Sequence, residues 1–238
     1  MNPTIAMITF RAMLGRRRAL LLFLLPAILL FLALALRVAG ENDPGVSAGV
    51  LQRFGLATLL PLLALIAGTG VIGPEIDDGQ ITYVLATPVP RRVVVLTKLA
   101  VAVALVALFG AVPTLAAGLL MTGTAEGMAP AFTVGVLVGG IAYAAVFVAL
   151  AVVSRNAVTI GLLYALVWET LLGNFAPGAR SASIQQWALS VTDALTGSSY
   201  VTSTVGLAVA VPLLAAVTVA GASLAVTRLR SLSIAGAE

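Results

Sequence analysis

The sequence lacks two residue types altogether and is poor in charged ones. Cysteine and histidine are absent, which excludes disulfides, thiol chemistry, haem ligation by histidine and the usual zinc sites. We therefore expect no catalytic residue and no metal site in this chain. Only 9% of the residues are charged, whereas a soluble domain carries about a quarter. Because 61% are hydrophobic, too little polar surface remains to cover a water-exposed globule, and a membrane protein is expected.

Lysine is almost missing as well, because every basic side chain except Lys98 is an arginine. A P-loop holds nucleotide phosphates with a glycine-rich turn that is followed by Lys and then Ser or Thr. Lys98 is followed by Leu99, and no glycine-rich loop precedes it. The chain therefore cannot hydrolyse ATP through that motif, and we expect it not to be an enzyme.

An intramembrane protease is excluded by the same scarcity of polar groups. Rhomboid-type proteolysis needs a serine–histidine pair, and zinc proteases need histidine ligands. An aspartyl protease needs two aspartates within membrane spans, and no aspartate of this sequence is placed there.

Six long apolar runs dominate what is present. They cover residues 19–36, 54–73, 99–121, 131–153, 157–175 and 204–227. Each is long enough to cross the roughly 30 Å hydrocarbon core as an α-helix. The strands of a β-barrel would alternate over about ten residues, which these unbroken runs do not. We predict an all-α polytopic membrane protein with a single transmembrane domain over residues 1–238, because no linker divides the chain.

The basic residues are distributed unequally between the two sides that six spans define. Both termini then lie on one side, and this side is rich in basic residues: Arg11, Arg16, Arg17, Arg18, Arg91, Arg92, Lys98, Arg155, Arg228 and Arg230. The other side holds only Arg37, Arg53 and Arg180. The positive-inside rule makes the richer side cytoplasmic, so both termini and residues 74–98 are expected there.

Residues 1–18 mix apolar and basic side chains ahead of the first run. This pattern predicts a short interfacial helix that lies on the cytoplasmic face of the membrane. The alternative is a basic flank that only sets the topology. The excess of arginine over lysine and the abundant alanine indicate a bacterial, GC-rich origin.

Residues 74–98 form a long polar stretch between two apolar runs, and it carries more acids and bases than any other such stretch. Pro74 suits the first turn of a helix, where three acids would lie near the positive end of the helix dipole: Glu75, Asp77 and Asp78. One apolar stripe follows at helical spacing: Ile81, Val84 and Leu85. Pro88 and Pro90 would end this helix, before Arg91, Arg92 and Lys98 lead into the third run. A short amphipathic helix is predicted, with an ordinary solvated loop as the alternative.

The stretch GPEIDDGQITYVLATPVPRRVVVLTKLAVA resembles the loop between the second and third spans of ABC-2 type permeases, the membrane subunits of ABC exporters. The residues that match the pattern of that family are Glu75, Asp78, Gly79, Val84, Leu85, Pro88, Arg91 or Arg92, and Lys98. The resemblance extends over the chain, from the N-terminal helix through six spans to a long loop between the fifth and sixth. In the fifth run, YALVWETLLGNF also resembles the family.

This resemblance implies a six-span type V fold in the cell membrane and a coupling helix between spans 2 and 3. Two copies of a separate ATP-binding subunit would receive that helix and would hold ATP and Mg, so that this chain carries no cofactor. A second permease copy, forming a homodimer, and the lipid bilayer are the other implied partners, and nucleic acid is not one. The residues implied at the ATPase-coupling interface are Glu75, Asp77, Asp78, Gly79, Ile81, Val84, Leu85, Pro88, Arg91 and Arg92. A secondary transporter or channel that ATP does not drive is the alternative.

An ionisable residue lies inside the fifth run, at Glu169 beside Trp168. Charged groups within a membrane span are expensive and usually functional. We expect Trp168 and Glu169 to line the translocation pathway. The alternative is that Glu169 reaches the outer interface and only stabilises packing.

Two further features concern the packing of helices. Residues 176–203 mix apolar and polar side chains, and by resemblance they would form re-entrant or interfacial helices, with a plain extracellular loop as the alternative. Gly135 and Gly139 form a GxxxG pattern in the fourth run, which allows close approach of another helix. That helix is expected to belong to the same chain, and a contact between two copies is the alternative.

Overall fold

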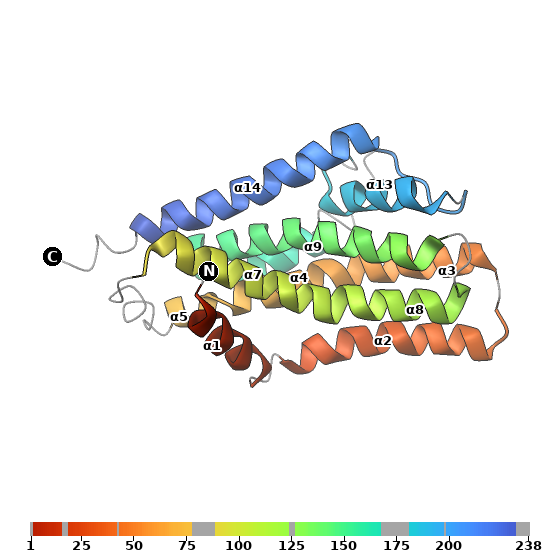
Figure 1. The fold of residues 1–238 in the computed structure, drawn as a ribbon, viewed down its shortest axis with the longest axis horizontal. Coiled ribbons are helices and arrows are strands. Elements are labelled where there is room, and N and C mark those ends of the chain that lie inside the picture. Colours follow the sequence, from red (N-terminus) through yellow and green to blue (C-terminus); the bar gives the residue numbers. More distant parts are fainter. Residues whose placement is uncertain are drawn as a thin grey trace.

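The computed structural model describes residues 2–15, 19–41, 43–77, 89–123, 127–167, 181–197 and 199–231. The regular secondary structure in these ranges is helical, and the helices run roughly along one axis as an elongated bundle (Figure 1). Five helical stretches in the described part are long and apolar enough to cross a membrane: Ala19–Val38, Pro44–Ile76, Arg91–Thr122, Met128–Val153 and Leu207–Arg230. The all-helical membrane architecture that the sequence predicts is thus confirmed, with five such helices rather than six in these ranges.

The five long stretches are built from these elements in chain order. The first is α2 (Ala19–Val38), and the second joins α3 (Pro44–Val50), the π-helical segment η1 (Leu51–Leu59), α4 (Leu60–Gly70) and α5 (Gly73–Asp77). The third joins α7 (Arg91–Val106), the π-helical segment η2 (Ala107–Ala111) and α8 (Val112–Thr122). The last two are α9 (Met128–Val153) and α14 (Leu207–Ser231). The described ranges also hold three shorter helices, namely α1 (Pro3–Leu14), α10 (Ala157–Leu163) and α13 (Ile184–Thr196).

Both π-helical segments lie directly before an internal proline. Pro61 is the second residue of α4, and Pro113 is the second residue of α8. A proline lacks the backbone N–H and its ring collides with the carbonyl four residues earlier, which here belongs to η1 or η2. The wider π turn relieves that collision, so the helix continues through the proline instead of ending.

The second and third long helical stretches begin at Pro44 and Arg91, earlier than the apolar runs that begin at residues 54 and 99. Residues 37–53 lie between the first two apolar runs and are expected to form a polar loop, but α3 already begins at Pro44. The side chain of Asp43 caps this helix by accepting a hydrogen bond from the backbone N–H of Gly45 at 2.8 Å. An N-cap aspartate followed by proline starts a helix regardless of hydrophobicity, and apolar runs alone do not reveal it.

The fifth apolar run is only partly described. Its first part forms an apolar helix over Ala157–Val167, and residues 168–175 lie outside the described ranges. The described helices therefore do not test the prediction that the chain has six spans. Helices also occur near the N-terminus, as α1, and within residues 176–203, as α13, and their interfacial or re-entrant placement stays a prediction.

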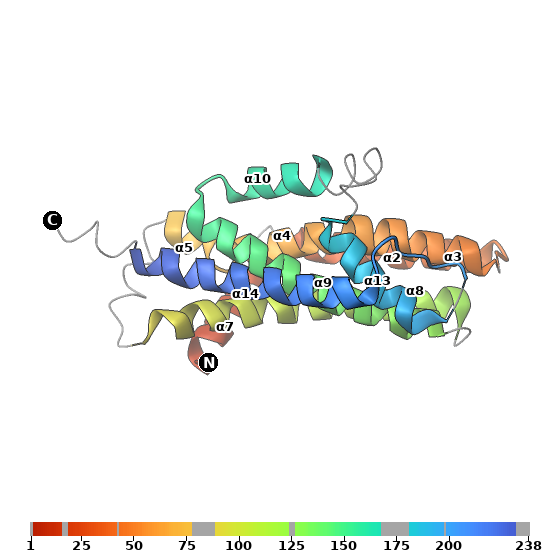
Figure 2. The same ribbon diagram turned by 90° about the horizontal axis from the view of Figure 1, so that it is seen from above.

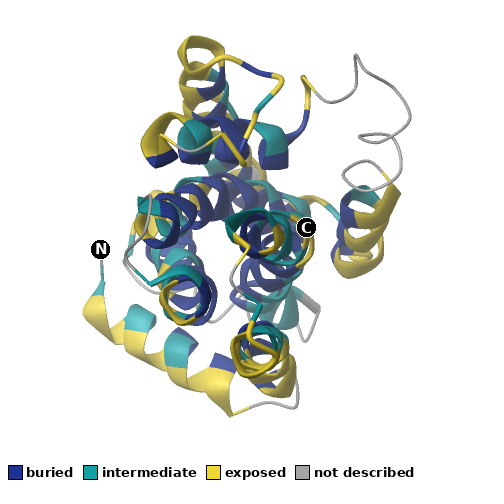
Figure 3. Cartoon of the chain, turned by 90° about the vertical axis from the view of Figure 1, so that its right-hand side faces the viewer, coloured by how far each residue is buried: buried dark blue, intermediate teal, exposed yellow. Residues whose placement is uncertain are grey.

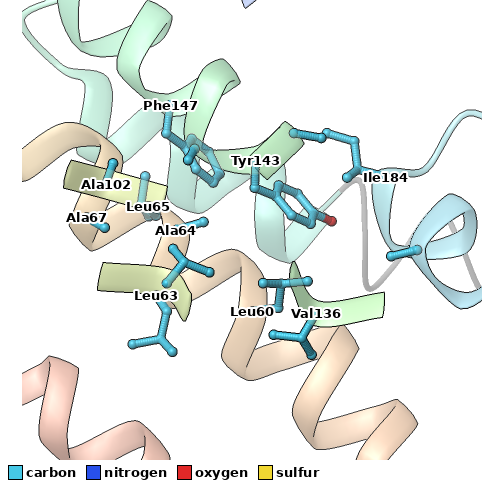
Figure 4. Close-up of a cluster of buried hydrophobic side chains, with 14 of the residues drawn as sticks. Leu60, Leu63, Ala64, Leu65, Ala67, Ala102, Val136, Tyr143, Phe147 and Ile184 are labelled. Atoms are coloured by element: carbon cyan, nitrogen blue, oxygen red, sulfur yellow. The ribbon is translucent and has the colours of Figure 1, made fainter. Parts of the chain in front are cut away.

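Helix α9 is the centre of the bundle. It contacts α4, α7, α8, α10, α13 and α14. Figure 3, viewed along the bundle, shows buried residues in the middle and exposed residues on the outer helices. Tyr143 and Phe147 of α9 are fully buried, and their rings stack with centroids 5.9 Å apart. Figure 4 shows these two rings beside Leu60 and Leu65 of α4.

Two long helices lie at the periphery. Only 28% of the apolar window of α2 and 22% of that of α14 is buried, against 72% for the Pro44–Ile76 stretch. Their outward side chains are large and apolar, among them Phe23, Phe31 and Val219. Surfaces of this kind are suited to contact with lipid chains, so α2 and α14 are expected to face the bilayer.

The GxxxG pattern brings α13 against α9 within the same chain. A Cβ atom on Gly139 would lie 2.8 Å from Cβ of Ala188, and one on Gly135 would lie 3.1 Å from the carbonyl oxygen of Ala188 and collide with Oγ1 of Thr192. Both glycines thus make room for α13. This agrees with the expectation of packing within one copy.

We predict that Gly135→Ala lowers the free energy of unfolding by about 1–2 kcal/mol, because the added methyl group displaces α13. Thr192→Ala in the same chain should recover part of the loss, since it removes the hydroxyl that collides. Thermal unfolding in detergent measures both. Gly49→Ala is the control because a Cβ there meets nothing within 4 Å. An unchanged melting temperature for Gly135→Ala would contradict this packing.

Candidate functional site

The described parts of the polar stretch 74–98 lie at the end of the bundle where α1 begins and α14 ends. Figures 1 and 2 place α5, the first turn of α7, α1 and the last turn of α14 at this end. Residues 78–88, which are predicted to dock on the ATP-binding subunit and are called the docking segment below, therefore follow α5 and precede α7 in the chain. Residues 78–88, which hold Asp78, Gly79, Ile81, Val84, Leu85 and Pro88, lie outside the described ranges. What the structure describes is how the two ends of this segment are held.

A buried ion pair connects the two ends. The ammonium Nζ of Lys98 on α7 lies 2.6 Å from Oε1 of Glu75 on α5. The same Nζ donates a hydrogen bond to the carbonyl oxygen of Val71 at 2.7 Å, just before α5. Lys98 is only 1% exposed, whereas the Glu75 side chain is 26% exposed. Lys98 thus joins α7, at the start of the third long helical stretch, to α5, at the end of the second.

Local sequence explains why the two side chains meet. Pro74 is the second residue of α5, and Pro90 directly precedes α7, so a proline marks each helix start. Lys98 lies seven residues after Arg91, which is about two turns into the helix. Its long apolar stem can lie among buried neighbours while the ammonium reaches the helix end.

The second carboxylate oxygen of Glu75 has a different environment. Oε2 is buried and, among the residues that the structure describes, has no hydrogen-bond partner. A buried acceptor without a partner is costly and uncommon. Toward the described residues, Glu75 therefore has one unpaired carboxylate oxygen, three positions before residue 78.

Helix α1 is attached to the same place. Asn2 caps α1, because its side-chain oxygen accepts hydrogen bonds from the backbone N–H groups of Thr4 and Ile5. The backbone N–H of Asn2 in turn donates to Oγ1 of Thr97 at 3.1 Å. Thr97 is fully buried and is the neighbour of Lys98 in the chain. The start of α1 is thereby fixed to α7 beside the ion pair.

The other end of α1 is fixed to α4. Met13 is 4% exposed and occupies the space that a side chain at position 70 would fill. A Cβ on Gly70 would lie 2.6 Å from Cε of Met13. Helix α1 thus bridges α7 and α4, which belong to the two long helical stretches on either side of residues 78–88.

We predict that Thr97→Val loosens the start of α1 while the bundle stays folded. The substitution keeps the shape of the buried side chain but removes the acceptor for Asn2, and such a hydrogen bond contributes about 1 kcal/mol. Amide hydrogen exchange in the first turn of α1 should speed up about fivefold. Exchange in the middle of α9 serves as the internal control. Equal exchange in both proteins would show that Asn2 and Thr97 do not hold α1.

Arg91, which is predicted at the coupling interface, contacts another helix of the bundle. Its guanidinium Nη1 donates to the carbonyl oxygen of Arg230 at 2.8 Å, near the end of α14. The last carbonyls of a helix lack partners within the helix and carry partial negative charge, which favours a guanidinium there. Arg92 is exposed, and Asp77 is the last residue of α5.

The structure brings together some predicted residues and not others. Glu75 and Lys98 form one contact, and Arg91 joins α7 to α14. Trp168 and Glu169, the predicted pathway residues, lie outside the described ranges. Among the described residues, no group of three or more acidic side chains is placed to hold a metal ion.

Sequence reasoning missed the pairing of Lys98 and the roles of Thr97 and Asn2. One signal for the pair was present. Glu75 follows the predicted second span by two residues and Lys98 precedes the predicted third span by one, so both lie at the same membrane depth. A lone lysine and an acid at equal depth on neighbouring helices are candidates for an ion pair.

The chain matches a known protein family over most of its length. The model of the ABC-2 family transporter proteins matches residues 14–176, which is more than half of the chain and includes the residues on both sides of 78–88. Among curated proteins, none matches the sequence.

Proposed function

The chain belongs to the ABC-2 family of transporter proteins, and we propose that it is the permease subunit of an ATP-driven ABC exporter. The family and the long apolar helices make it a multi-pass membrane protein and a permease component of an ABC transporter. The proposal adds that a separate ATP-binding subunit, in two copies, binds and hydrolyses ATP with Mg. It also adds that two copies of this chain form the pathway in the cell membrane and that Trp168 and Glu169 line it.

The observation that carries the coupling proposal is the contact of Lys98 with both Glu75 and Val71. If the connections of residues 78–88 to α5 and α7 were flexible, a displacement of these residues would not move the two helices. A buried charge-assisted contact between the two ends of the segment resists such deformation, because separating the groups leaves an ammonium uncompensated. A displacement of the docking segment is then passed to the second and third long helices together.

The neighbouring contacts spread the same displacement further. Asn2 and Met13 tie α1 to α7 and α4, and Arg91 ties α7 to α14. Helix α4 in turn packs on α9, the central helix. We propose that these contacts let one docking event at residues 78–88 reorient several helices as a unit. That is what a permease needs in order to change the access of its pathway.

The side of the membrane is part of the proposal. Six arginines in the described ranges support a cytoplasmic location for the end where α1 begins and α14 ends, by the positive-inside rule. They are Arg11, Arg91, Arg92, Arg155, Arg228 and Arg230.

The absence of cysteine allows a direct test of this orientation. A single cysteine at Val84 is expected to react with a membrane-impermeant maleimide only after cells are permeabilised. A single cysteine at Ala39, which is exposed just beyond the end of α2, should react in intact cells. The reverse pattern would place the termini outside and overturn the proposed orientation.

The proposed division of labour is tested by purification. A tagged chain should co-purify with an ATP-binding subunit, and ATPase activity should appear in the complex and not in the chain alone. Transport in vesicles should then require ATP and should persist when a protonophore removes the proton gradient. Flux that a proton gradient drives without ATP would identify a secondary transporter instead.

A further inference from the structure

A second feature lies away from the docking segment, between α9 and α14. These two helices lie side by side (Figures 1 and 2), and a groove of about 320 Å³ runs between them. Helix α9 contributes Val146, Leu150 and Val153, and α14 contributes Val217, Gly221 and Leu224. Every lining residue is apolar, and the volume falls at the lower end of the range of about 300–1,000 Å³ for ligand pockets.

The groove results from one close approach of the two backbones. A Cβ on Gly221 would lie 2.8 Å from the carbonyl carbon and oxygen of Ala145, so the helices touch without side chains there. Small residues beside this contact, Ala149 and Ala220, leave space where larger ones would interdigitate. The result is a furrow that α9 closes on one side and α14 on the other.

A cation follows the groove on the same face of α14. The lining positions 217, 220, 221 and 224 recur at helical spacing, and Arg228 comes four residues after Leu224. Arg228 is exposed and lies about 10 Å beyond Gly221 along the helix. Helix α9 ends at Val153, which lines the groove, and the exposed Arg155 comes two residues later in the chain. On α14, the apolar groove is therefore followed one turn later, on the same face, by the exposed Arg228.

We propose that this groove holds an acyl chain of an anionic phospholipid whose phosphate contacts Arg228. Charge complementarity selects this occupant, because a guanidinium at the end of an apolar furrow matches a phosphate attached to a hydrocarbon chain. A guanidinium binds phosphate through parallel N–H donors, and an anionic headgroup adds attraction that a zwitterionic one lacks. The site would fix the position of α14 against the central helix.

Native mass spectrometry of the delipidated full chain tests the site. The probes are phosphatidylglycerol, phosphatidylcholine with the same acyl chains, and soluble glycerol phosphate. The chain is expected to bind phosphatidylglycerol about fivefold more tightly than phosphatidylcholine, the factor expected for one arginine beside an anionic headgroup. Glycerol phosphate, which has no acyl chain, should not bind in the same concentration range.

Variants separate the two parts of the site. Ala220→Trp fills the groove from its exposed side and should weaken binding of both lipids at least tenfold. Val219→Trp is the matched control, because Val219 is 67% exposed and lies outside the groove, and it should bind like the parent. Arg228→Gln should remove the fivefold preference and leave binding of phosphatidylcholine unchanged, whereas Arg228→Lys should keep most of the preference.

Several results would overturn the proposal. Equal affinity for the two lipids in the parent, or equal behaviour of Ala220→Trp and Val219→Trp, would show that the groove is not a lipid site. Glycerol phosphate that binds as tightly as phosphatidylglycerol would reduce the site to a simple anion site. If Ala220→Trp instead converts a dimer to a monomer and leaves lipid binding intact, a second copy of the chain occupies the groove.

Discussion

Replacing Glu75 by alanine is expected to destabilise the protein more than replacing its partner Lys98 by methionine. Lys98 is 1% exposed, so without Glu75 its ammonium stays buried with only the carbonyl of Val71 as a described partner. Removing one member of a buried pair costs about 3–5 kcal/mol, and since Glu75 is partly exposed we expect about 2–3 kcal/mol. Lys98→Met leaves a carboxylate that can turn to water, and should cost about 1 kcal/mol.

The double variant distinguishes a coupled pair from two independent residues. Glu75→Ala with Lys98→Met should be about as stable as Lys98→Met alone, because the buried charge is gone. The free energy of unfolding in mixed detergent micelles gives all corners of the cycle. In complex with the ATP-binding subunit, the same variants should still allow ATP hydrolysis. The permease should, however, no longer change the rate of that hydrolysis. Additive losses in the cycle would mean that the two groups do not interact.

The second large effect is expected at Gly68, where α4 packs closely on α9. A Cβ on Gly68 would lie 2.8 Å from Cβ of Phe147 and 3.2 Å from the backbone nitrogen of Val148. Neither atom belongs to the flexible end of a side chain, so the helices themselves must separate. Gly68→Ala should therefore cost about 2–3 kcal/mol, the upper range for overpacking.

Gly55 provides the matched control for Gly68 on the same long helix. A Cβ on Gly55 would meet nothing within 4 Å, and alanine is the better helix former by about 0.5–1 kcal/mol. Gly55→Ala should leave the melting temperature in detergent unchanged or raise it. Similar melting temperatures for the two variants would contradict a tight contact between α4 and α9.

The sequence predicts the long helices well and their starts poorly. Runs such as 19–36 and 131–153 end within a few residues of α2 and α9, because the apolar length that a bilayer requires is visible in composition. The start at Pro44 was missed because a cap at Asp43, rather than hydrophobicity, sets it. The π-helical segments before Pro61 and Pro113 could not be predicted either, since a proline inside a run is compatible with a kink or a plain α-helix.

The candidate site was predicted as a stretch but not as a set of contacts. Glu75 was named because acids favour the first turn of a helix, which says nothing about its partner. That Lys98 reaches back to Glu75, and that Arg91 turns to α14, depends on how α7 lies beside α5 and α14. Such placement follows from packing between segments far apart in the chain, and periodicity within one segment does not encode it.

The central claim is that residues 78–88 receive an ATP-binding subunit, and disulfide cross-linking tests it most directly. In the cysteine-free chain, a cysteine at Val84 should form a cross-link with a single cysteine on the ATP-binding subunit in native membranes. A cysteine at Ala39, beyond α2 at the opposite end of the bundle, should form none. Absence of any cross-link from positions across 78–88, or an equal yield from Ala39, would contradict the account.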